Sequence, residues 1–328
     1  MTPKHNLLAH SLAMHDIDAA TSTIADERPF AAADDGDAYA RLLAEVEALR
    51  SENEDLKLLY EATIEHGEAV EDQLAESNML LQRVQTRLEE ELHDALRYVL
   101  SLLPAPRQSG PRTDWLLVPS TELGGDSFGY HDIDADHFAI YLLDVCGHGV
   151  GAALLSASVI NVLRASALPN ADFRDPSAVL AGLNASFPME KQNNMFFTIW
   201  YGVYQRSTGR LSFSSGGHPP AILLHEMPDG SVSTDLLIGS GGIAIGAIAD
   251  LDYDAASVFV QPGDRLLVLS DGTYEIATAG GEPLTFQDIL DFTRKPGGDE
   301  PPAVLAWARA ANGAETLPDD FSFLRIEF

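Results

Sequence analysis

The sequence has little cysteine and no long apolar run. Cys146 is the only cysteine among 328 residues, which excludes an internal disulfide and a cysteine-based zinc cluster. No run reaches the roughly 18 apolar residues of a membrane-spanning helix, and the first residues lack a basic segment followed by an apolar core, so no secretory signal is evident. We therefore expect a soluble, cytoplasmic protein without a membrane partner, whose metal sites would use carboxylates or histidines.

Positive charge is also scarce. Lys and Arg total 20 against 50 Asp and Glu, which gives a formal net charge of −30. Such a charge repels polyanions and argues against nucleic acid or an anionic membrane as a ligand. Apolar residues make up 45% of the chain, a composition typical of a globular protein.

The first third of the chain predicts a tail followed by a stalk. Residues 1–37 are acidic and lack sustained periodicity, which predicts a flexible tail. From Leu42 to Ala95 a heptad pattern with spacings of four and three predicts a coiled-coil regulatory and dimerisation linker over residues 38–103. The prolines Pro104 and Pro106 end this helix, because proline is not accommodated in a helix interior. The seam consists of Leu42, Val46, Leu49, Asn53, Leu56, Tyr60, Thr63, Gly67, Val70, Leu74, Ser77, Leu81, Val84, Leu88, Glu91 and Ala95.

The centre of this seam is weak. Asn53 at a core position favours a defined two-stranded register, whereas Gly67 costs about 1 kcal/mol relative to alanine in a helix interior. We predict that the stalk forms a homodimer and that its soft centre near Thr63 and Gly67 sets activity. An upstream sensor or regulator protein would bind within residues 1–100. The alternative is an amphipathic helix that folds onto its own domain.

Residues 112–328 predict a second, α+β domain. Strand-like runs alternate with Gly-rich or Pro-containing turns, and the order of strands, two helices and then a long strand block favours a sandwich over a βαβ alternation. The expected strands are 115–119, 137–144, 196–204, 211–215, 221–225, 257–260, 265–270 and 321–328. The expected helices are 152–167 and 176–187.

Acidic residues stand beside glycine or at strand ends in four places. They are Asp126, Asp144, Asp271 and the adjacent pair Asp319 and Asp320. Unpaired carboxylates at neighbouring strand ends repel one another, and a hard divalent cation with oxygen ligands removes that penalty. The set therefore indicates Mg²⁺ or Mn²⁺, with a water between two ions placed to attack a phosphoryl group. A single Asp-Gly after a strand is typical of an ordinary turn, so the prediction depends on the whole set.

These acidic sites lie in blocks whose order resembles the stage II sporulation protein E (SpoIIE) branch of the PPM superfamily of metal-dependent phosphatases. The resemblance covers residues 112–328. The matching blocks are Gly124 to Asp126, Asp144 to Ala153, Gly216 to Pro220, Pro262 to Asp264 with Ser270 to Gly272 and Glu275, and Asp319 to Ser322. It implies two antiparallel β-sheets sandwiched between α-helices, with two Mn²⁺ or Mg²⁺ ions between the sheets.

The resemblance also implies an activity. The family's members are protein serine/threonine phosphatases that act on phosphoserine or phosphothreonine regulatory proteins, often STAS-type antagonists of anti-sigma factors, and their helical linker often governs activity. The chain is accordingly expected to hydrolyse such a phosphoprotein by means of a metal-activated water, without a covalent phosphoenzyme.

Site roles follow from the resemblance residue by residue. Asp144 would bridge the two metal ions. Asp126 would hold one ion or its water, and Asp271 and Asp319 the other. Asp320 is the alternative to Asp319, because the adjacent pair cannot be ordered from sequence. Asp126, Asp144 and Asp271 are the expected catalytic residues.

Other residues near these blocks have weaker assignments. The Val145 carbonyl is a further candidate ligand, and Gly125 and His148 are candidate lining residues, with His148 either touching the site or shaping its turn. Cys146, where the family often has serine, is interpreted as structural, with a redox role as the alternative. His218 in its Gly-Gly-His-Pro-Pro turn is also expected to be structural.

One position departs from the family. A second acid commonly follows the first-motif aspartate by three residues, and this chain has Gly129 there, with Asp132, Asp134 and Asp136 later. Gly129 and the long stalk motivate a second hypothesis, a catalytically weak pseudo-phosphatase that acts as a partner-binding scaffold. A third hypothesis makes the coiled coil the working part and the globular domain a passive anchor.

Overall fold

The structure is a computed structural model that describes residues 35–120, 123–239, 242–278 and 281–328. The predicted acidic tail lies almost wholly outside the described residues. The chain divides into two compact units, residues 1–83 and residues 84–328, which are described separately below.

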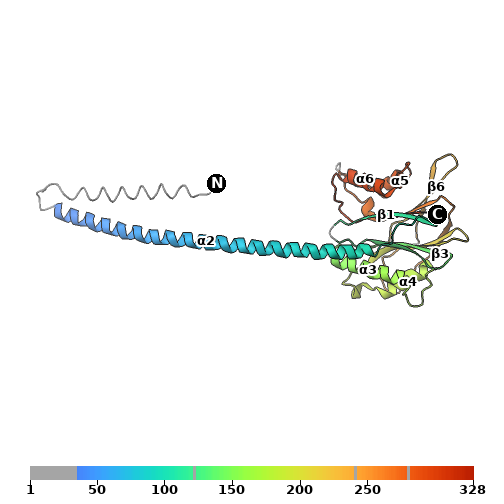
Figure 1. The fold of residues 1–328 in the computed structure, drawn as a ribbon, viewed down its shortest axis with the longest axis horizontal. Helices are drawn as coiled ribbons and strands as arrows, with labels where there is room; N and C mark the ends of the chain where they lie inside the picture. Colours follow the sequence, from blue (N-terminus) through green and yellow to red (C-terminus); the bar gives the residue numbers. More distant parts are fainter. Residues whose placement is uncertain (1–34, 121–122, 240–241, 279–280) are drawn as a thin grey trace. The chain divides into compact units, whose positions relative to one another are not determined.

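Helix α2 spans Asp35–Ser101 (Figure 1). The expected long helix is therefore present, and Gly67 does not interrupt it. Apolar seam residues are exposed along its length; Leu56, for example, is 57% exposed and Leu74 is 58% exposed. No helix in the described part of the chain is both long enough and apolar enough to cross a membrane. The pairing of α2 with a second copy remains a prediction.

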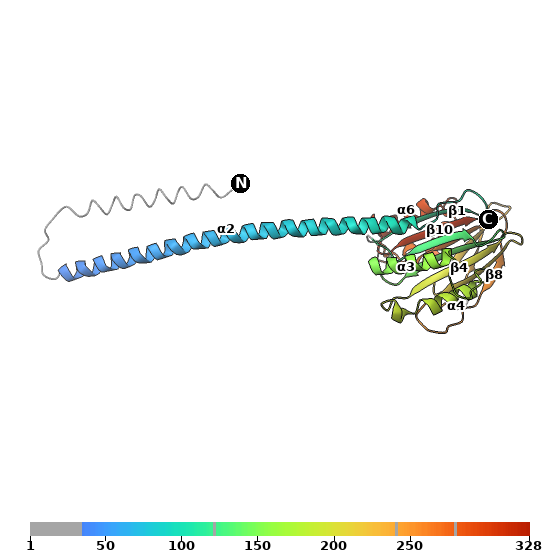
Figure 2. The same cartoon turned by 60° about the horizontal axis from the view of Figure 1, so that its bottom comes forward.

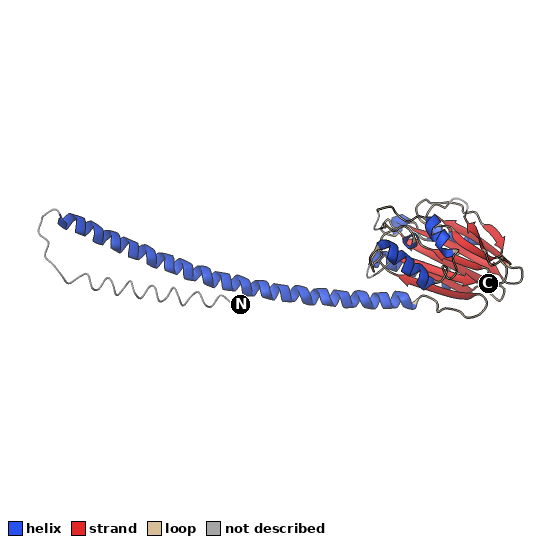
Figure 3. Cartoon of the chain, turned by 90° about the horizontal axis from the view of Figure 1, so that it is seen from above, coloured by secondary structure: helices blue, strands red, loops and turns tan. Residues whose placement is uncertain are grey.

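Two five-stranded antiparallel sheets form the centre of residues 112–328 (Figure 3). The first sheet has the order β1 (Arg112–Val118), β10 (Phe321–Glu327), β9 (Arg265–Leu269), β6 (Ala221–Glu226) and β7 (Val232–Leu237). The second has the order β2 (Ser127–Asp132), β3 (His137–Val145), β4 (Phe197–Gln205), β5 (Arg210–Gly216) and β8 (Ala256–Phe259).

Helices cover the outer face of each sheet. Helices α3 (Val150–Arg164) and α4 (Pro176–Ser186) pack on the second sheet, and α5 (Phe286–Thr293) and α6 (Pro301–Asn312) pack on the first. Figures 1 and 2 show the two helical layers on opposite sides of the paired sheets. This is the predicted α+β sandwich, and the fold class is confirmed.

Strand β3 shows how the sheets direct their side chains. Successive residues of a strand point to opposite faces. The even-numbered residues pack in the layer between the sheets, whereas the odd-numbered ones pack against α3 and α4. The even set is Phe138, Ile140 and Leu142, and the odd set is Ala139, Tyr141, Leu143 and Val145. Asp144 is the next even-numbered residue and therefore faces the layer between the sheets.

Four elements were missing from the sequence-based expectation: β2, β7, α5 and α6. Strand β7 is a largely exposed edge strand with little apolar alternation. Helix α5 begins with a capping box formed by Thr285 and Asp288, and α6 has Pro301 in its first turn and Gly313 after its last, with a φ of 73°. Both helices therefore carried recognisable boundary signals.

A buried ion-pair cluster joins β9 and β10 at the end of these strands away from the acidic motifs. Asp299 is 5% exposed, and its Oδ2 lies 2.9 Å from the Nε atoms of both Arg265 and Arg325. Arg265 begins β9 and Arg325 lies near the end of β10, so the shared carboxylate fixes the two strands relative to each other. These are the strands that carry Asp271 and Asp319 at their other ends.

We expect Asp299→Asn to lower the free energy of unfolding by about 3 kcal/mol, because the substitution leaves two largely buried guanidinium groups without their shared carboxylate. Chemical denaturation followed by tryptophan fluorescence measures the loss. The control is Asp291→Asn, which removes an exposed partner of Arg294 and should cost less than about 1 kcal/mol. Equal losses in the two variants would contradict the assignment.

Candidate active site

The predicted acids come together at one end of the sandwich. Asp144 lies near the end of β3, and Asp126 directly precedes β2, whose Ser127 pairs with Leu143 of β3. From the other sheet, Asp271 follows β9 and the Asp319–Asp320 pair precedes β10, and these two strands are also antiparallel neighbours. Both sheets thus deliver carboxylates to the same end.

The electrostatics of Asp126 and Asp144 reflect this convergence. Burial raises the pKa of Asp126 well above its ordinary value, and the charges of Asp144 and Asp320 raise it further. Burial also raises the pKa of Asp144 to about 7, with added effects from Asp271 and Asp319. Both groups are therefore destabilised as anions when no cation is nearby.

Asp271 belongs to the same cluster. It begins the short 3₁₀ helix η4 (Asp271–Thr273). Burial raises its pKa, and the charges of Asp319 and Glu275 raise it further. Glu275 is exposed, so it adds negative charge at the rim of the cluster. The sequence-predicted acids are all brought into one electrostatic neighbourhood.

The cluster has the donor chemistry of a site for hard divalent cations. In the described residues, no group of three or more His, Cys, Asp or Glu side chains is already arranged as a ligand set. However, Oδ2 of Asp126 is buried with no hydrogen-bond partner, and the mutual repulsion of the carboxylates is the penalty that a cation with oxygen ligands removes. The residues therefore fit Mg²⁺ or Mn²⁺.

The backbone of the first motif passes close to the Val145 carbonyl. A Cβ atom at Gly125 would lie 2.6 Å from the carbonyl oxygen of Val145 and 3.0 Å from that of Gly147. Only glycine allows this approach. Gly125 thus contacts the backbone of the Asp144 motif, and the roles of Gly125 as a lining residue and of the Val145 carbonyl as a ligand stay predictions.

The members of the adjacent pair have different surroundings. Asp320 is 5% exposed, and its carboxylate accepts hydrogen bonds from the backbone N–H groups of Ser120 at 2.8 Å and Gly125 at 2.7 Å. Asp319 is exposed, and its Oδ1 accepts one from the N–H of Asp320 at 2.8 Å. The sequence alone did not show which of the two acids is the candidate metal ligand. The structure places their carboxylates in distinct environments.

Gly129 lies on the opposite face of β2 from the acidic cluster. It pairs with Tyr141 on the face that meets α3 and α4. A Cβ atom at Gly129 would lie 2.5 Å from the Tyr141 ring and hydroxyl. An acid at this position would collide with Tyr141, so the glycine is explained by packing.

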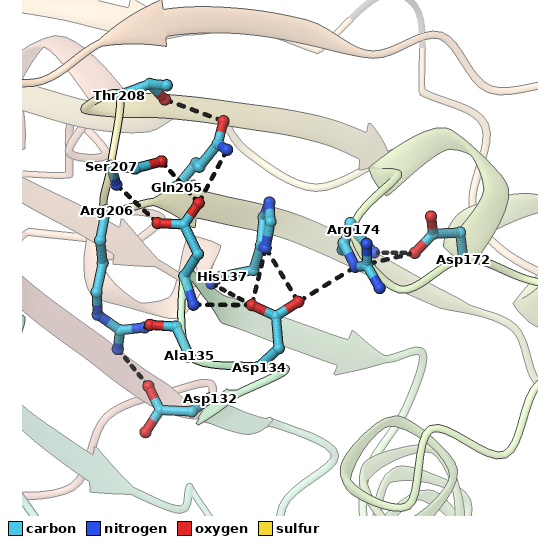
Figure 4. A network of polar contacts seen from close by, with 11 residues as sticks. Asp132, Asp134, Ala135, His137, Asp172, Arg174, Gln205, Arg206, Ser207 and Thr208 are labelled. Atoms are coloured by element: carbon cyan, nitrogen blue, oxygen red, sulfur yellow. Dashed lines mark hydrogen bonds and ion pairs between the residues drawn. The ribbon is translucent and has the colours of Figure 1, made fainter.

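The later acids Asp132, Asp134 and Asp136 do not join the site either. They lie in and beside the turn between β2 and β3, at the other end of β3 from Asp144. Figure 4 shows Asp132 and Asp134 among their polar partners. The Asp134 carboxylate contacts His137 Nδ1 at 2.9 Å and Arg174 Nε at 3.2 Å. The remaining partners of this network are Arg107 and Arg206 for Asp132, and Gln205 and Ser207 for Asp136.

Three other predicted residues lie near the site's turns. His148 is exposed between Gly147 and Gly149, which both have a φ of 90°, so its contact with a ligand remains a prediction. Cys146 is half-buried and its Sγ accepts a hydrogen bond from the Phe196 N–H at 3.3 Å. Burial lowers the pKa of His218 to about 4, and its Nδ1 contacts the Pro219 carbonyl at 3.0 Å.

Sequence reasoning missed the hydroxyl groups beside the acids. Thr198 pairs with Asp144 in the register of β3 and β4, and its hydroxyl is buried without a partner in the described residues. Ser270 donates to the Asp320 carbonyl at 3.1 Å and accepts from the Ser322 N–H at 3.1 Å. The available signal for Thr198 was its place as the one Ser or Thr residue in the apolar and aromatic β4 segment.

The fold is that of the PP2C-type phosphatase domains. The SiaA PP2C domain of Pseudomonas aeruginosa superimposes with a TM-score of 0.63 at 22% identity, covering 75% of this chain and 98% of that domain. A structure of the Bacillus subtilis SpoIIE phosphatase domain with a regulatory fragment gives 0.56 at 16% identity, covering 67% of this chain and 64% of the other.

The chain belongs to the stage II sporulation protein E family, whose model matches residues 134–328. This match includes Asp144, Asp271 and Asp319 and begins after Asp126. Two Bacillus subtilis proteins are similar over much of this region: the phosphoserine phosphatase RsbU, 26% identical over 229 residues, and the phosphoserine phosphatase RsbP, 24% identical over 212 residues. The alignments cover 69% and 63% of this chain, and 64% and 50% of those relatives.

The raised pKa values predict how the metal-free protein responds to pH. A carboxyl group whose pKa is higher in the folded than in the unfolded state destabilises the fold as pH rises from its unfolded value through its folded value. For Asp144 this window runs from the ordinary 3.8 to about 7. We expect Asp144→Asn to be more stable than the unsubstituted protein by roughly 2 kcal/mol at about pH 7.5, and by little at about pH 4.

Thermal and chemical denaturation in the presence of a chelator measure this difference at each pH. Comparing the two proteins cancels the general effect of the net charge. Added Mn²⁺ should stabilise the unsubstituted protein near pH 7.5 and stabilise Asp144→Asn much less. A variant that is less stable at every pH, together with no response to Mn²⁺, would contradict the assignment of this cluster.

Proposed function

We propose that the chain is a metal-dependent protein serine/threonine phosphatase. The observation that carries this proposal is the convergence of Asp126, Asp144 and Asp271, all with raised pKa values, at one end of the sandwich in a SpoIIE-family chain. In the part of the chain that the structure describes, no Lys or Arg forms an ion pair with these carboxylates, which suits a reaction in which metal ions neutralise the phosphoryl charge.

Five oxygen donors would hold two Mn²⁺ or Mg²⁺ ions. Asp144 would bridge them, Asp126 would serve one ion, and Asp271 and Asp319 would serve the other, with the Val145 carbonyl as a further donor. When bound, the ions would lower the pKa of a water nucleophile and stabilise charge on the phosphoryl group.

The protein residues would fix the positions of these donors. The carboxylates stand on or beside paired strands, so their separations are set by strand register. The layer between the sheets is closed by buried side chains, including Phe128 and Leu142, which limits water access from behind. Hydroxyl groups such as that of Thr198 are available to orient bound water.

The proposed substrate is a phosphoserine or phosphothreonine regulatory protein. Both of the curated relatives described above are phosphoserine phosphatases by name, which supports this substrate class. Within the class we favour a STAS-type antagonist of an anti-sigma factor in the cytoplasm. The pseudo-phosphatase alternative loses one of its two motives, because Gly129 faces Tyr141 on the side of β2 away from the acidic cluster.

We expect Mn²⁺-dependent release of phosphate from a phosphoserine protein and from p-nitrophenyl phosphate. Asp144→Asn should reduce kcat/KM by roughly a thousandfold, because the reaction loses a central metal ligand. The charge-matched control is Asp252→Asn, an exposed acid outside the cluster, which should retain full activity. If the unsubstituted full chain shows no turnover at any Mn²⁺ concentration, the scaffold hypothesis replaces the enzyme hypothesis.

We also propose that α2 dimerises the protein. Two leucines near its middle are similarly exposed, Leu56 at 57% and Leu58 at 64%. Leu56 occupies the heptad seam, together with the polar core residue Asn53, whereas Leu58 lies outside the seam. A second copy of α2 would cover the seam and bury its apolar residues.

The carboxy-terminal end of α2 supports a role in control. Within residues 84–328, a small apolar pocket lies between this end and the first acidic motif, and its lining includes Asp126 and Asp320. Its apolar walls are Leu96, Val99, Leu100, Leu103, Leu117, Pro119 and Leu123. The segment after the helix is anchored to β1 and α3, because the Trp115 indole donates to the Pro104 carbonyl at 3.0 Å and Arg164 to the Leu102 carbonyl at 3.0 Å. A change in this end of the helix would therefore reach the first metal-binding motif.

We expect the full chain to sediment as a dimer and Leu56→Glu to sediment as a monomer, because a charge in the seam opposes helix pairing. Leu58→Glu is the matched control and should leave the dimer intact. Analytical ultracentrifugation at several concentrations distinguishes the cases. Indistinguishable behaviour of the two variants, or a monomeric unsubstituted chain, would refute the heptad assignment.

A further inference from the structure

We infer that Asp320 is a positioning residue: it holds the first acidic motif in place and does not serve as a metal ligand. This inference deepens the proposed function and rests on it, because the motif that Asp320 holds carries the proposed ligand Asp126. It also resolves the choice that sequence left open between Asp319 and Asp320.

The Asp320 carboxylate receives four hydrogen bonds from the segment that leads into β2. Its Oδ1 accepts from the Ser120 N–H at 2.8 Å and from the Ser120 hydroxyl at 3.0 Å. Its Oδ2 accepts from the Gly125 N–H at 2.7 Å and the Asp126 N–H at 3.4 Å. All four bonds join residues about 200 positions apart in sequence, so this one side chain ties the beginning of the domain to its end.

These bonds use the acceptor capacity of the side chain. A carboxylate offers about four lone-pair sites, and four donors occupy them here. The Asp319 carboxylate, by comparison, receives one described hydrogen bond, from the Asp320 N–H. Of the two neighbours, Asp319 therefore keeps oxygen lone pairs for a cation.

The first glycine of the Gly-Gly-Asp motif is explained by the same contact. A Cβ atom at Gly124 would lie 2.2 Å from Asp320 Oδ2, so any larger residue would push the segment off the carboxylate. The second glycine, Gly125, allows the approach to the Val145 carbonyl described above. The two glycines thus serve two different contacts, one with each neighbouring motif.

The backbone of Asp320 is fixed as well. Its carbonyl accepts a hydrogen bond from the Ser270 hydroxyl at 3.1 Å, and Ser270 directly precedes Asp271. Its N–H donates to Asp319. The side chain of Asp320 therefore contacts the motif of Asp126, while its backbone contacts those of Asp271 and Asp319. Three of the four proposed carboxylate ligands are positioned through this residue.

Hydrogen exchange of the metal-free protein tests this role independently of catalysis. In Asp320→Ala the amides of Ser120, Gly125 and Asp126 should exchange at least about tenfold faster, because their shared acceptor is gone. In Asp320→Asn the loss should be intermediate, since the amide side chain keeps one acceptor oxygen. Asp319→Ala should leave these amides unchanged. Titration calorimetry should show Mn²⁺ affinity reduced about tenfold or more in all three variants, through misplacement of Asp126 or loss of a ligand.

Two controls test whether the change in hydrogen exchange is specific and whether each variant is folded. Asp264→Asn alters another buried carboxylate, which accepts a hydrogen bond from the Gln261 N–H at 2.8 Å, and should not change exchange of the Ser120, Gly125 and Asp126 amides. Unchanged hydrogen exchange in β4 shows that a variant is folded. If Asp320→Ala does not fold, Ser120→Ala replaces it, because it removes one hydroxyl donor to Asp320. Unaltered exchange of these three amides in both Asp320 variants would overturn the inference, and so would equally faster exchange in Asp319→Ala. Failure of the phosphatase assay alone would overturn only the proposed function.

Discussion

Repulsion among carboxylates at one end of the sandwich is the constraint around which this domain is organised. Asp126, Asp144 and Asp271 are held there by paired strands, and burial together with neighbouring negative charge raises the pKa of each. A flexible chain would separate such charges. Strand register prevents this, so the repulsion persists, and a cation with oxygen ligands would relieve it. The hydrogen bonds of Asp320 are part of the same arrangement, since they oppose the tendency of the first motif to move away.

Acidic residues have different partners at the two ends of strand β3. At the end of β3 that carries His137, acids meet cations or hydrogen-bond donors: Asp134 contacts His137 and Arg174, and the His137 ring lowers the pKa of Asp134 to about 2 (Figure 4). At the Asp144 end, no Lys or Arg of the described residues forms an ion pair with the clustered acids. Basic side chains thus pair with the acids near the β2–β3 turn, such as Asp134. The acids that suit metal binding, such as Asp144, are those without an Arg or Lys partner in the described residues.

The sequence predicted the fold class and the acidic cluster because both depend on local signals. The apolar runs of β3 and β4 and the glycine-flanked aspartates can be read from neighbouring residues alone. Asp319 and Asp320 could not be ordered, because adjacent identical side chains differ only through contacts with Ser120 and Gly125, about 200 residues away. The significance of Gly129 was hidden for the same reason, since its partner Tyr141 lies on another strand. The overlooked α5 and α6 had boundary signals, so those omissions reflect incomplete use of the sequence.

The end of α2 adds a geometric reason for coupling between the stalk and the site. In residues 84–103 the heptad seam includes the exposed residues Val84 and Leu88, whereas Leu96 and Val99, outside the seam, are partly buried against the domain. The seam and the face that carries Leu96 and Val99 are adjacent on one helix. A partner helix on the seam would therefore fix the rotation of α2 about its axis, and with it the side of the helix that faces Gly124 to Asp126. That motif moves only if the bonds to Asp320 adjust, and those bonds in turn hold Asp126. If α2 pairs as proposed, contacts within residues 84–328 would join this end of the helix to the proposed ligand Asp126 without rearrangement of either sheet.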